Sequence, residues 1–357
     1  MTGPTARPVK LVCSHLWKLY GAHAVRRLRE RGIDLAASDP ASSRHVAGEL
    51  GLIVAASDVS FEVRAGECFV VMGLSGSGKS TVVRCLSRLV EPTAGDVELE
   101  GKSLLRMSER ELIEVRRRRM GMVFQHFGLF NHLSVIENVA FPLKVQGISR
   151  SEREKRACET IELVGLKGRE ESYPWELSGG QQQRVGFARS LAVGPDLWFL
   201  DEPFSALDPL IRRQMQTEFL NLKRMLGKTV VFITHDFLEA VYLADRIAIM
   251  RAGEIVQIGT PAELILRPAT DYVRQFIRDV PRPMVLTAGD IAEPIGDGDL
   301  AADPAPQIDA GTLLAEILAR ISIHAPALMV VDSAGRPVGR LTPQSLSRAL
   351  DSTEPPS

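Results

Sequence analysis

Glycines, a lysine and a hydroxyl at fixed spacing form the motif of this chain that most clearly indicates chemistry. The run from Met72 to Thr81 reads MGLSGSGKST. Glycine permits positive φ angles, so such a loop can point its backbone N–H groups at phosphate oxygens. Lys79 adds a point charge for the β and γ phosphates, and the Ser80 hydroxyl can ligate Mg²⁺. The motif predicts a nucleoside triphosphate site formed by Gly73, Leu74, Ser75, Gly76, Ser77, Gly78, Lys79, Ser80 and Thr81.

Two carboxylates follow an apolar segment further along the chain. Asp201 and Glu202 come directly after residues 197–200, which read as a buried strand. Asp201 is expected to hold Mg²⁺, directly or through water, and Glu202 to polarise the water that attacks the γ-phosphate. A solvated acidic pair is the competing interpretation. The order of this pair and the phosphate loop along the chain favours a single shared site.

Two more polar side chains are expected at the ends of neighbouring strands. His235 follows a strand expected at 229–234 and is predicted to contact the γ-phosphate and to hold the attacking water with Glu202. Gln125 follows a strand expected at 120–124 and is predicted to sense Mg²⁺ and that water. The predicted catalytic residues are Glu202, His235 and Gln125, and the predicted Mg²⁺ residues are Ser80, Gln125 and Asp201.

A second glycine motif precedes the helix expected at 184–192. A helix N-terminus of this kind can grip phosphate. A second phosphate grip is redundant within one chain, so this motif is expected to serve a nucleotide held by another copy. Asp208 lies in the segment expected between the two sites. The residues predicted to act on the other copy's nucleotide are Leu177, Ser178, Gly179, Gly180 and Gln181.

These residues require a sheet to bring them together. Apolar strands alternate with helical segments, which indicates an α/β core with its sites at the strand C-termini. A helical middle is expected from about 133 to 166, and the turn at Ala252-Gly253 is expected to join a hairpin. Two helices are expected before residue 53, at 22–31 and 43–50, as an insert.

Composition limits the classes of function that remain. The chain has 357 residues, 45% of them hydrophobic, and a formal net charge of −1, so it lacks the global basic field of a nucleic-acid binder. The run Arg116 to Arg119 is a local exception, and a solvated helix end is favoured over a polyanion site. The four cysteines show no paired spacing, which fits a reducing compartment. Apolar runs of about 18 residues are missing, so any membrane role is expected to be peripheral.

In their order, the motifs resemble those of the ATP-binding-cassette (ABC) ATPases over residues 9–279. The resemblance implies a P-loop NTPase fold with a helical subdomain, ATP and Mg²⁺ as ligands, and a head-to-tail dimer. Each ATP then lies between the phosphate loop of one copy and the second glycine motif of the other. The matching motifs are Walker A (73–81), the Q-loop (Gln125), the signature (177–181), Walker B (197–202), the D-loop (205–208) and the switch histidine (His235).

Within that family, four strings and the insert resemble the glycine betaine/proline (quaternary amine) importers. The strings are MGLSGSGKST, RLVEPTAG, FSALDPLIR and DRIAIM. This resemblance implies the ATPase subunit of an importer for compatible solutes such as glycine betaine, choline or proline. Its implied partners are a second copy, an integral-membrane permease and, indirectly, a solute-binding protein, at the cytoplasmic face of a bacterial inner membrane. The solute itself and the permease are not specified by these strings.

Three alternatives differ in their expected partners. The same motor serving an amino acid or a sulfonate is the nearest. A non-transport cassette acting on DNA or the ribosome is disfavoured, because the chain has no tandem cassette and no room for a long coiled coil between its Walker motifs. No nucleic-acid partner is therefore expected. A regulatory nucleotide sensor driven by the tail is the third alternative.

The expected domains are a cassette at 1–280, a linker at 281–306 and a tail module at 307–357. The cassette holds the insert at 21–52 and a helical subdomain at about 126–192. The tail segment 328–342 is similar to a CBS motif, for which a remnant that aids dimerisation and a sensor of ionic strength or nucleotide are both open. Tyr20 is the candidate for stacking on adenine, with Val54 or a neighbour as the alternative. Phe130-Asn131-His132 and Pro142 depart from the family pattern where the permease is expected to bind.

Overall fold

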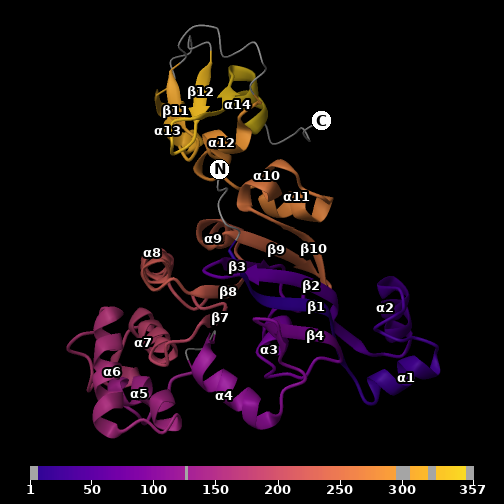
Figure 1. Ribbon diagram of the computed structural model, residues 1–357, viewed down its shortest axis with the longest axis vertical. Coiled ribbons are helices and arrows are strands. Elements are labelled where there is room, and N and C mark those ends of the chain that lie inside the picture. Colours follow the sequence, from indigo (N-terminus) through magenta and orange to yellow (C-terminus); the bar gives the residue numbers. More distant parts are fainter. Residues whose placement is uncertain (1–6, 125–127, 295–305, 321–326, 351–357) are drawn as a thin grey trace. The chain divides into compact units, whose positions relative to one another are not determined.

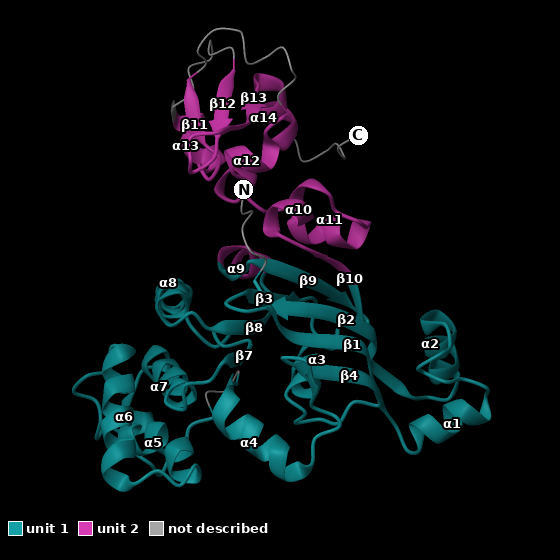
Figure 2. Ribbon diagram, in the orientation of Figure 1, with its two compact units in different colours: residues 1–236, 243–255 teal, residues 237–242, 256–357 magenta. Residues whose placement is uncertain are grey.

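The computed structural model of the chain describes residues 7–124, 128–294, 306–320 and 327–350. Gln125, expected to sense Mg²⁺, therefore lies outside the described residues. The chain forms two compact units, residues 1–236 with 243–255 and residues 237–242 with 256–357 (Figure 2). This division differs from the boundary expected at residue 280, because the segment from 256 onward groups with the tail.

A parallel sheet forms the core of the first unit. The strands of this sheet that belong to the first unit have the order β9-β3-β8-β7-β6, and neighbouring strands run parallel. Every residue of β3, β7 and β8 is buried, as expected for continuous apolar strands covered on both faces. The carboxyl ends of parallel strands share one edge, where the predicted site residues follow. The strands are β3 (Cys68–Met72), β6 (Met120–Val123), β7 (Leu197–Asp201), β8 (Thr229–Thr234) and β9 (Arg246–Arg251).

The turn expected at Ala252-Gly253 is present after β9. Both residues have positive φ, 49° and 86°, and the N–H of Gly253 donates to the carbonyl of Ser77 at 3.0 Å. The next strand, β10 (Glu254–Gly259), starts directly after this turn. The hairpin turn therefore packs against the phosphate loop.

An antiparallel sheet with the order β2-β1-β4-β5 completes the strands of this unit. β1 is one strand of 12 residues, and a register shift between Cys13 and Leu16 accommodates His15 at φ 49°. Such a shift is typical of a β-bulge. The strands are β1 (Val9–Tyr20), β2 (Ile53–Arg64), β4 (Ala94–Leu99) and β5 (Lys102–Ser103).

The insert forms two helices, α1 (Ala24–Glu30) and α2 (Pro40–Glu49), with an apolar cluster of its own. Asp39 caps α2 by accepting a hydrogen bond from the N–H of Ser42 at 2.9 Å. The buried members of the cluster come from β1 and from the insert, so the insert is attached to the sheet through its core. They are Trp17, Leu19, Ala24, Leu28, Leu35, Ala47 and Leu52.

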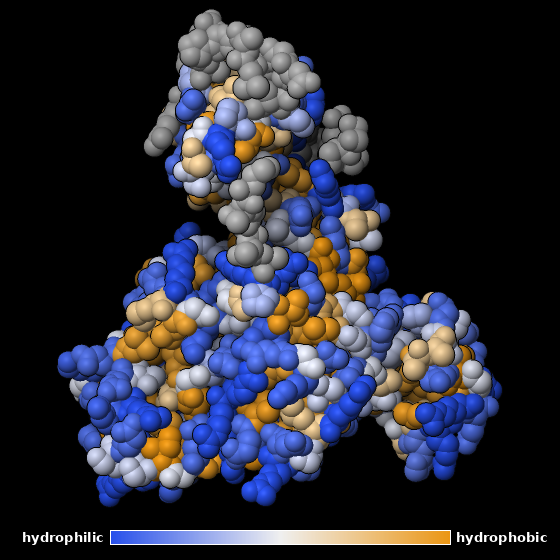
Figure 3. Space-filling view, viewed as in Figure 1, coloured by the Kyte–Doolittle hydropathy of each residue, from blue (hydrophilic) through white to orange (hydrophobic). Residues whose placement is uncertain are grey.

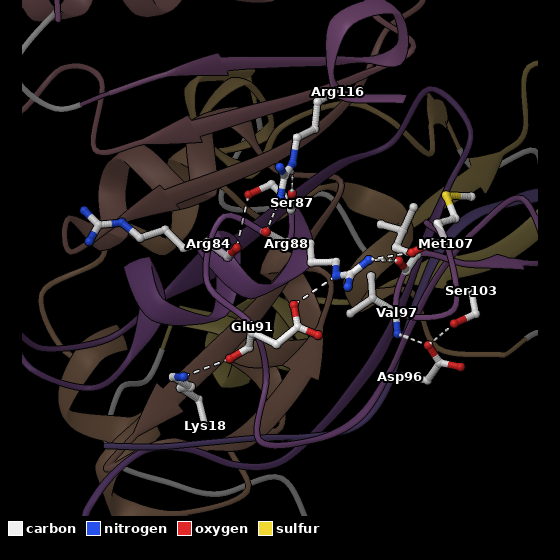
Figure 4. A network of polar contacts seen from close by, with 11 residues as sticks. Lys18, Arg84, Ser87, Arg88, Glu91, Asp96, Val97, Ser103, Met107 and Arg116 are labelled. Carbon is white, nitrogen blue, oxygen red and sulfur yellow. Dashed lines mark hydrogen bonds and ion pairs between the residues drawn. The ribbon is translucent and has the colours of Figure 1, made fainter. Parts of the chain in front are cut away.

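The helix after the phosphate loop is held at its C-terminal end by arginines. α3 (Lys79–Leu86) ends beside α4 (Glu109–Arg119), and Figure 4 shows Arg116 of α4 directed at that end. The Arg116 guanidinium donates to the carbonyls of Ser87, at 3.1 Å, and of Arg88. Arg88 in turn donates to the carbonyl of Leu104 at 2.8 Å. A cation at a helix C-terminus is favoured by the helix dipole, so Arg116 has a structural role.

The rest of the arginine run is also engaged within the chain. Arg117 and Arg118 pair with Glu114, at 3.2 and 2.9 Å, and Arg119 pairs with Glu100 at 2.6 Å. These contacts agree with the structural interpretation of the run rather than with a polyanion site.

Three helices form a separate group in the first unit: α5 (Val135–Val145), α6 (Arg150–Leu163) and α7 (Gly179–Leu191) (Figure 1). α8 (Pro209–Leu226) follows β7 and lies beside α7, and hydrophobic residues are visible between them (Figure 3). Arg184 of α7 and Glu218 of α8 form an ion pair of 2.7 Å at a cavity of about 240 Å³ there. α5 and α6 lie within the helical segment expected from about 133 to 166.

The second unit has a three-stranded sheet with the order β11-β12-β13. β11 is parallel and β13 antiparallel to β12. Its elements are α9 (Phe237–Leu243), most of β10, α10 (Pro261–Leu266), α11 (Asp271–Ile277), η2 (Arg282–Met284), α12 (Ala288–Ile291), β11 (Gln307–Asp309), α13 (Leu314–Arg320), β12 (Leu328–Val331), β13 (Pro337–Leu341) and α14 (Pro343–Leu350).

The structure differs from the linker expected at 281–306. Leu286 and Ala288 are fully buried, and the N–H of Ala288 donates to the carbonyl of Thr312 at 2.8 Å. The N–H of Leu314 donates to the carbonyl of Leu286 at 2.9 Å. Burial of these two apolar side chains draws residues 282–294 into the tail module, which therefore starts before residue 307. The described part of the chain holds no helix that is both long and apolar enough to span a bilayer.

Candidate active site

The phosphate loop runs from the end of β3 to the start of α3. Gly73 and Gly78 have φ of 156° and 100°, and a side chain at either position would collide with a backbone carbonyl, that of Met250 or of Ala55. The loop therefore needs glycine at both positions. The buried Lys79 donates to the carbonyls of Gly73 and Leu74 at 2.9 and 3.0 Å, so its ammonium lies inside the loop. Burial lowers the pKa of Lys79.

Ser80, on the first turn of α3, meets the end of β7. Its hydroxyl donates to Oδ1 of Asp201 at 2.9 Å, and Asp201 is buried. Burial raises the pKa of the Asp201 carboxyl, which the Ser80 hydrogen bond partly offsets. Arg84 lies one helical turn after Ser80, and its Nη2 is 4.0 Å from Oδ2 of Asp201. The sequence reasoning missed Arg84, although an i, i+4 spacing from Ser80 places it on the same helix face.

Glu202 and His235 meet at the ends of the neighbouring strands β7 and β8. Nδ1 of His235 lies 2.9 Å from Oε2 of Glu202. The Glu202 side chain is 16% exposed and that of His235 is 54% exposed. The structure thus brings together five of the predicted residues at one edge of the sheet: Lys79, Ser80, Asp201, Glu202 and His235.

The second glycine motif lies in the helical group, at the start of α7. Ser178 caps this helix: its hydroxyl accepts a hydrogen bond from the N–H of Gln181 at 3.4 Å, and the Gln181 side chain accepts one from the N–H of Ser178 at 2.9 Å. Gly180 lies against Ile211 of α8, and Gly179 against Leu207. α7 and α3 lie in different parts of the first unit (Figure 1). The structure therefore does not bring this motif to the phosphate loop of the same chain.

Two further predicted residues lie at element ends. Asp208 directly precedes α8, at the N-terminus of that helix. Tyr20 ends β1, is 42% exposed, and has the Lys18 ammonium 4.9 Å from its ring centroid. It pairs with Ile53, which is 67% exposed and is a neighbour of Val54, the expected alternative. Ala55, two residues after Ile53 on β2, contacts the phosphate loop at Gly78.

Comparisons with known proteins agree with this geometry. The family model described as ABC transporter matches residues 56–205. The chain is 47% identical to the trimethylamine N-oxide transport system ATP-binding protein TmoW of Pelagibacter ubique, over 96% of this chain and 97% of the relative. It is 46% identical to the glycine betaine/proline betaine transport system ATP-binding protein ProV of Escherichia coli, over 83% of this chain and 72% of the relative.

A solved structure is similar as well. It is the dimeric post-hydrolysis state of the ATP-binding cassette MJ0796 bound to ADP and Pi, with a TM-score of 0.58 and 31% identity, covering 70% of this chain and 98% of that chain. A phosphate loop facing a strand-end aspartate is the arrangement of a P-loop NTPase. With these relatives, the chain belongs to the ABC transporter family as an ATP-binding protein and ATPase. The family and the α/β fold expected from the sequence are confirmed.

Proposed function

We propose that the chain is the ATP-hydrolysing subunit of an importer for small methylated amines, such as trimethylamine N-oxide or glycine betaine. One observation carries the choice of solute class. The relatives that match nearly end to end are trimethylamine N-oxide transport proteins, whereas the glycine betaine relatives are matched over about three quarters of their length or less. Both solutes present a methylated nitrogen, so one class of solute unites the two groups of relatives.

Five residues have proposed roles in hydrolysis. Lys79 binds the β and γ phosphates of ATP, and Glu202 accepts a proton from the attacking water. His235 holds the Glu202 carboxylate through Nδ1. Ser80 and Asp201 offer hydroxyl and carboxylate oxygens at the loop, which fits Mg²⁺, an ion commonly held by one or two carboxylates and substrate phosphates. When bound, Mg²⁺ neutralises charge that develops on the phosphate oxygens.

The proposed working unit is a head-to-tail dimer of two copies. Residues Leu177 to Gln181 of one copy contact the γ-phosphate held by the other, and Asp208 lies between the sites. Two findings support this proposal. The motif lies away from the phosphate loop of its own chain, and the similar cassette MJ0796 is dimeric with ADP and Pi bound.

The proposed surface for the permease is the groove between α5 and α6, a cavity of about 260 Å³. Its wall mixes apolar and charged residues, which suits a polar helix with one apolar face. The rings of Phe130 and Phe141 pack together at a tilt of 50°, with centroids 4.6 Å apart. The permease would receive solute from a binding protein and place this subunit at the cytoplasmic face of a bacterial inner membrane. The lining residues are Leu133, Ile136, Glu137, Ala140, Phe141, Lys144, Arg150, Arg153 and Glu154.

The tail is proposed to be a CBS-like regulatory module. Its βαβ arrangement supports this assignment: β11 and β12 are parallel strands joined through α13. The ligand of the module is left open, with ionic strength and nucleotide as the two signals to test.

Reconstitution tests the proposal. The chain, its permease and its binding protein are placed in lipid vesicles, and ATPase activity is measured with trimethylamine N-oxide, glycine betaine, choline, proline and an unrelated amino acid, at several ionic strengths. Stimulation by a methylated amine is expected. Stimulation by the unrelated amino acid alone would overturn the solute class, and co-purification with nucleic acid instead of a membrane protein would overturn the transport function.

A further inference from the structure

An exposed tryptophan lies just before the second glycine motif. The chain has three tryptophans; Trp17 and Trp198 are fully buried, whereas Trp175 is 65% exposed. Tyr173 stacks on one face of Trp175, with ring centroids 4.6 Å apart and an interplanar angle of 9°. Tyr173 is itself 37% exposed, so the two rings together offer a flat apolar surface to a ligand.

The backbone that carries this pair of rings is held in place. The Glu176 carboxylate accepts a hydrogen bond from the N–H of Tyr173 at 2.7 Å, and the N–H of Glu176 donates to the carbonyl of Tyr173 at 2.9 Å. The Gln182 amide, on α7, donates to the carbonyl of Pro174 at 2.9 Å. The rings are therefore tied to the same helix that carries the glycine motif. Such preorganisation lowers the entropy cost of binding a flat ligand.

We propose that Trp175 stacks on the adenine of the ATP held by the other copy in the dimer. The inference rests on the proposed function, because only the head-to-tail dimer brings this surface to a nucleotide. Two residues separate Trp175 from Ser178, so the three chain steps between them span at most about 11 Å. This distance is within the length of one ATP molecule, so the indole can reach the base of the nucleotide whose γ-phosphate the second glycine motif is proposed to contact. Tyr173 covers the opposite face of the indole and leaves one face for the base.

The chemistry of the surface suits a base better than a charged ligand. Aromatic rings stack on nucleobases without needing a hydrogen-bond pattern, so a bare indole face is sufficient. The neighbouring carboxylate of Glu176 is engaged in backbone hydrogen bonds, which leaves the stacked rings as the exposed feature. Tyr20, the other candidate for stacking, belongs to the chain that holds the ATP. The two residues therefore make separable predictions.

Intrinsic fluorescence gives a direct test, because Trp175 is the exposed tryptophan. The Glu202→Gln variant is mixed with MgATP in the absence of permease, and quenching of tryptophan emission by acrylamide is compared with and without nucleotide. ATP is expected to shield Trp175, and tripolyphosphate, which lacks a base, is not. Equal quenching of Trp175 in the monomer and in the ATP dimer overturns the proposal.

Substitution separates this inference from the proposed function. In the Glu202→Gln background, Trp175→Ala is expected to raise the ATP concentration for half-maximal dimerisation about 5- to 150-fold, the effect of losing one stacked base. Trp175→Phe is expected to restore most of the lost ATP affinity, and neither substitution is expected to alter ADP binding by the monomer.

Dimerisation of Trp175→Ala at the same ATP concentration as the parent would overturn the stacking role alone. Absence of any ATP-dependent dimer in the parent contradicts the proposed working unit. Shielding that appears only with permease present assigns the surface to the permease and overturns the inference.

Discussion

Glu202 and His235 form a direct pair, with Nδ1 of the imidazole 2.9 Å from Oε2 of the carboxylate. Glu202 has a φ of 47°, a left-handed conformation that is uncommon for a residue with a side chain. Its N–H donates to the carbonyl of Ile233 at 3.1 Å, which holds that conformation against the neighbouring strand. Backbone conformations of this kind cluster at functional sites. Strand pairing thus fixes the carboxylate proposed as the base, and the histidine fixes its orientation.

Glu202→Gln is expected to lower ATP turnover by about 10²- to 10⁴-fold, because the amide cannot accept the proton of the attacking water. The volume of the side chain is kept, so ATP binding is expected to remain intact. Steady-state hydrolysis and equilibrium ATP binding measure the two effects. Glu67→Gln is a matched control on a buried glutamate directly before β3, at the opposite end of that strand from the phosphate loop. Near-normal hydrolysis by Glu202→Gln would remove this residue from its assigned role.

Ser80→Ala is expected to raise the Mg²⁺ concentration needed for half-maximal hydrolysis. The hydroxyl lost by this change lies 2.9 Å from the Asp201 carboxylate, where the ion is proposed to bind. Titration of activity with Mg²⁺ at saturating ATP measures the shift, and ATP binding without Mg²⁺ measures whether the loop is intact. Ser87→Ala serves as the control at the other end of α3, where the hydroxyl donates to the carbonyl of Val83. An unchanged Mg²⁺ requirement in Ser80→Ala would argue against this ligand.

Arg116→Met is expected to lower the free energy of unfolding by about 1.5–3 kcal/mol, the range for hydrogen bonds to charged groups. The substitution leaves the carbonyls at the end of α3 without the donors that Figure 4 shows. Arg118→Met, whose side chain is 64% exposed, is expected to stay within about 0.5 kcal/mol of the parent. Chemical denaturation checks both. Equal stability of the two variants would contradict a structural role that distinguishes Arg116.

The sequence predicts where the strands and helices begin and end better than it predicts which of these elements contact one another. The strand at Thr229–Thr234 has the bounds expected from its apolar pattern, since such a pattern is local information. The Arg116 contact with the end of α3 joins segments that are distant along the chain, and no local pattern specifies it. The same limit applies to the tail: a composition rich in Gly, Asp and Pro predicts a linker, but two apolar residues in it are buried by tertiary packing.

The predicted site shows the same division. Lys79, Asp201 and His235 follow from residue type and position after a strand, because the carboxyl ends of parallel strands share one edge. Arg84 was not predicted, since its proximity to Asp201 depends on how α3 packs against β7. The exposure of Trp175 is a property of the folded surface, and a tryptophan in sequence is more often expected inside.

Acid is expected to weaken an ion-pair network between the two sheets. Hydrogen bonds from Lys10 and Arg119 lower the pKa of the Glu100 carboxyl. A carboxyl whose pKa is lower in the folded state stabilises the fold above its unfolded pKa of about 4.3, and that stabilisation is lost as the pH falls through the folded pKa. Glu100→Gln should therefore lower Tm at pH 7, and the difference in Tm should shrink as the pH falls below about 4.3. A difference in Tm that stays constant over this range would contradict the network's role.

Mixing two inactive variants tests whether the active site is shared between copies. Lys79→Ala removes the charge that binds phosphate, and Ser178→Arg places a bulky cation at the start of α7, which the proposal assigns to the other copy's nucleotide. In a mixed dimer, both defects fall in the same composite site, so the second site is complete.

Each variant alone is expected to be inactive, and a mixture is expected to regain part of the parent activity, up to about half per mixed dimer if the sites act independently. Ser178→Ala loses the helix cap and the hydroxyl without adding a bulky cation, so comparing it with Ser178→Arg separates those losses from blockage of the site. A mixture as inactive as its components, while sedimentation shows mixed dimers, would contradict independent composite sites. Full activity of Ser178→Arg alone would remove the second glycine motif from the site.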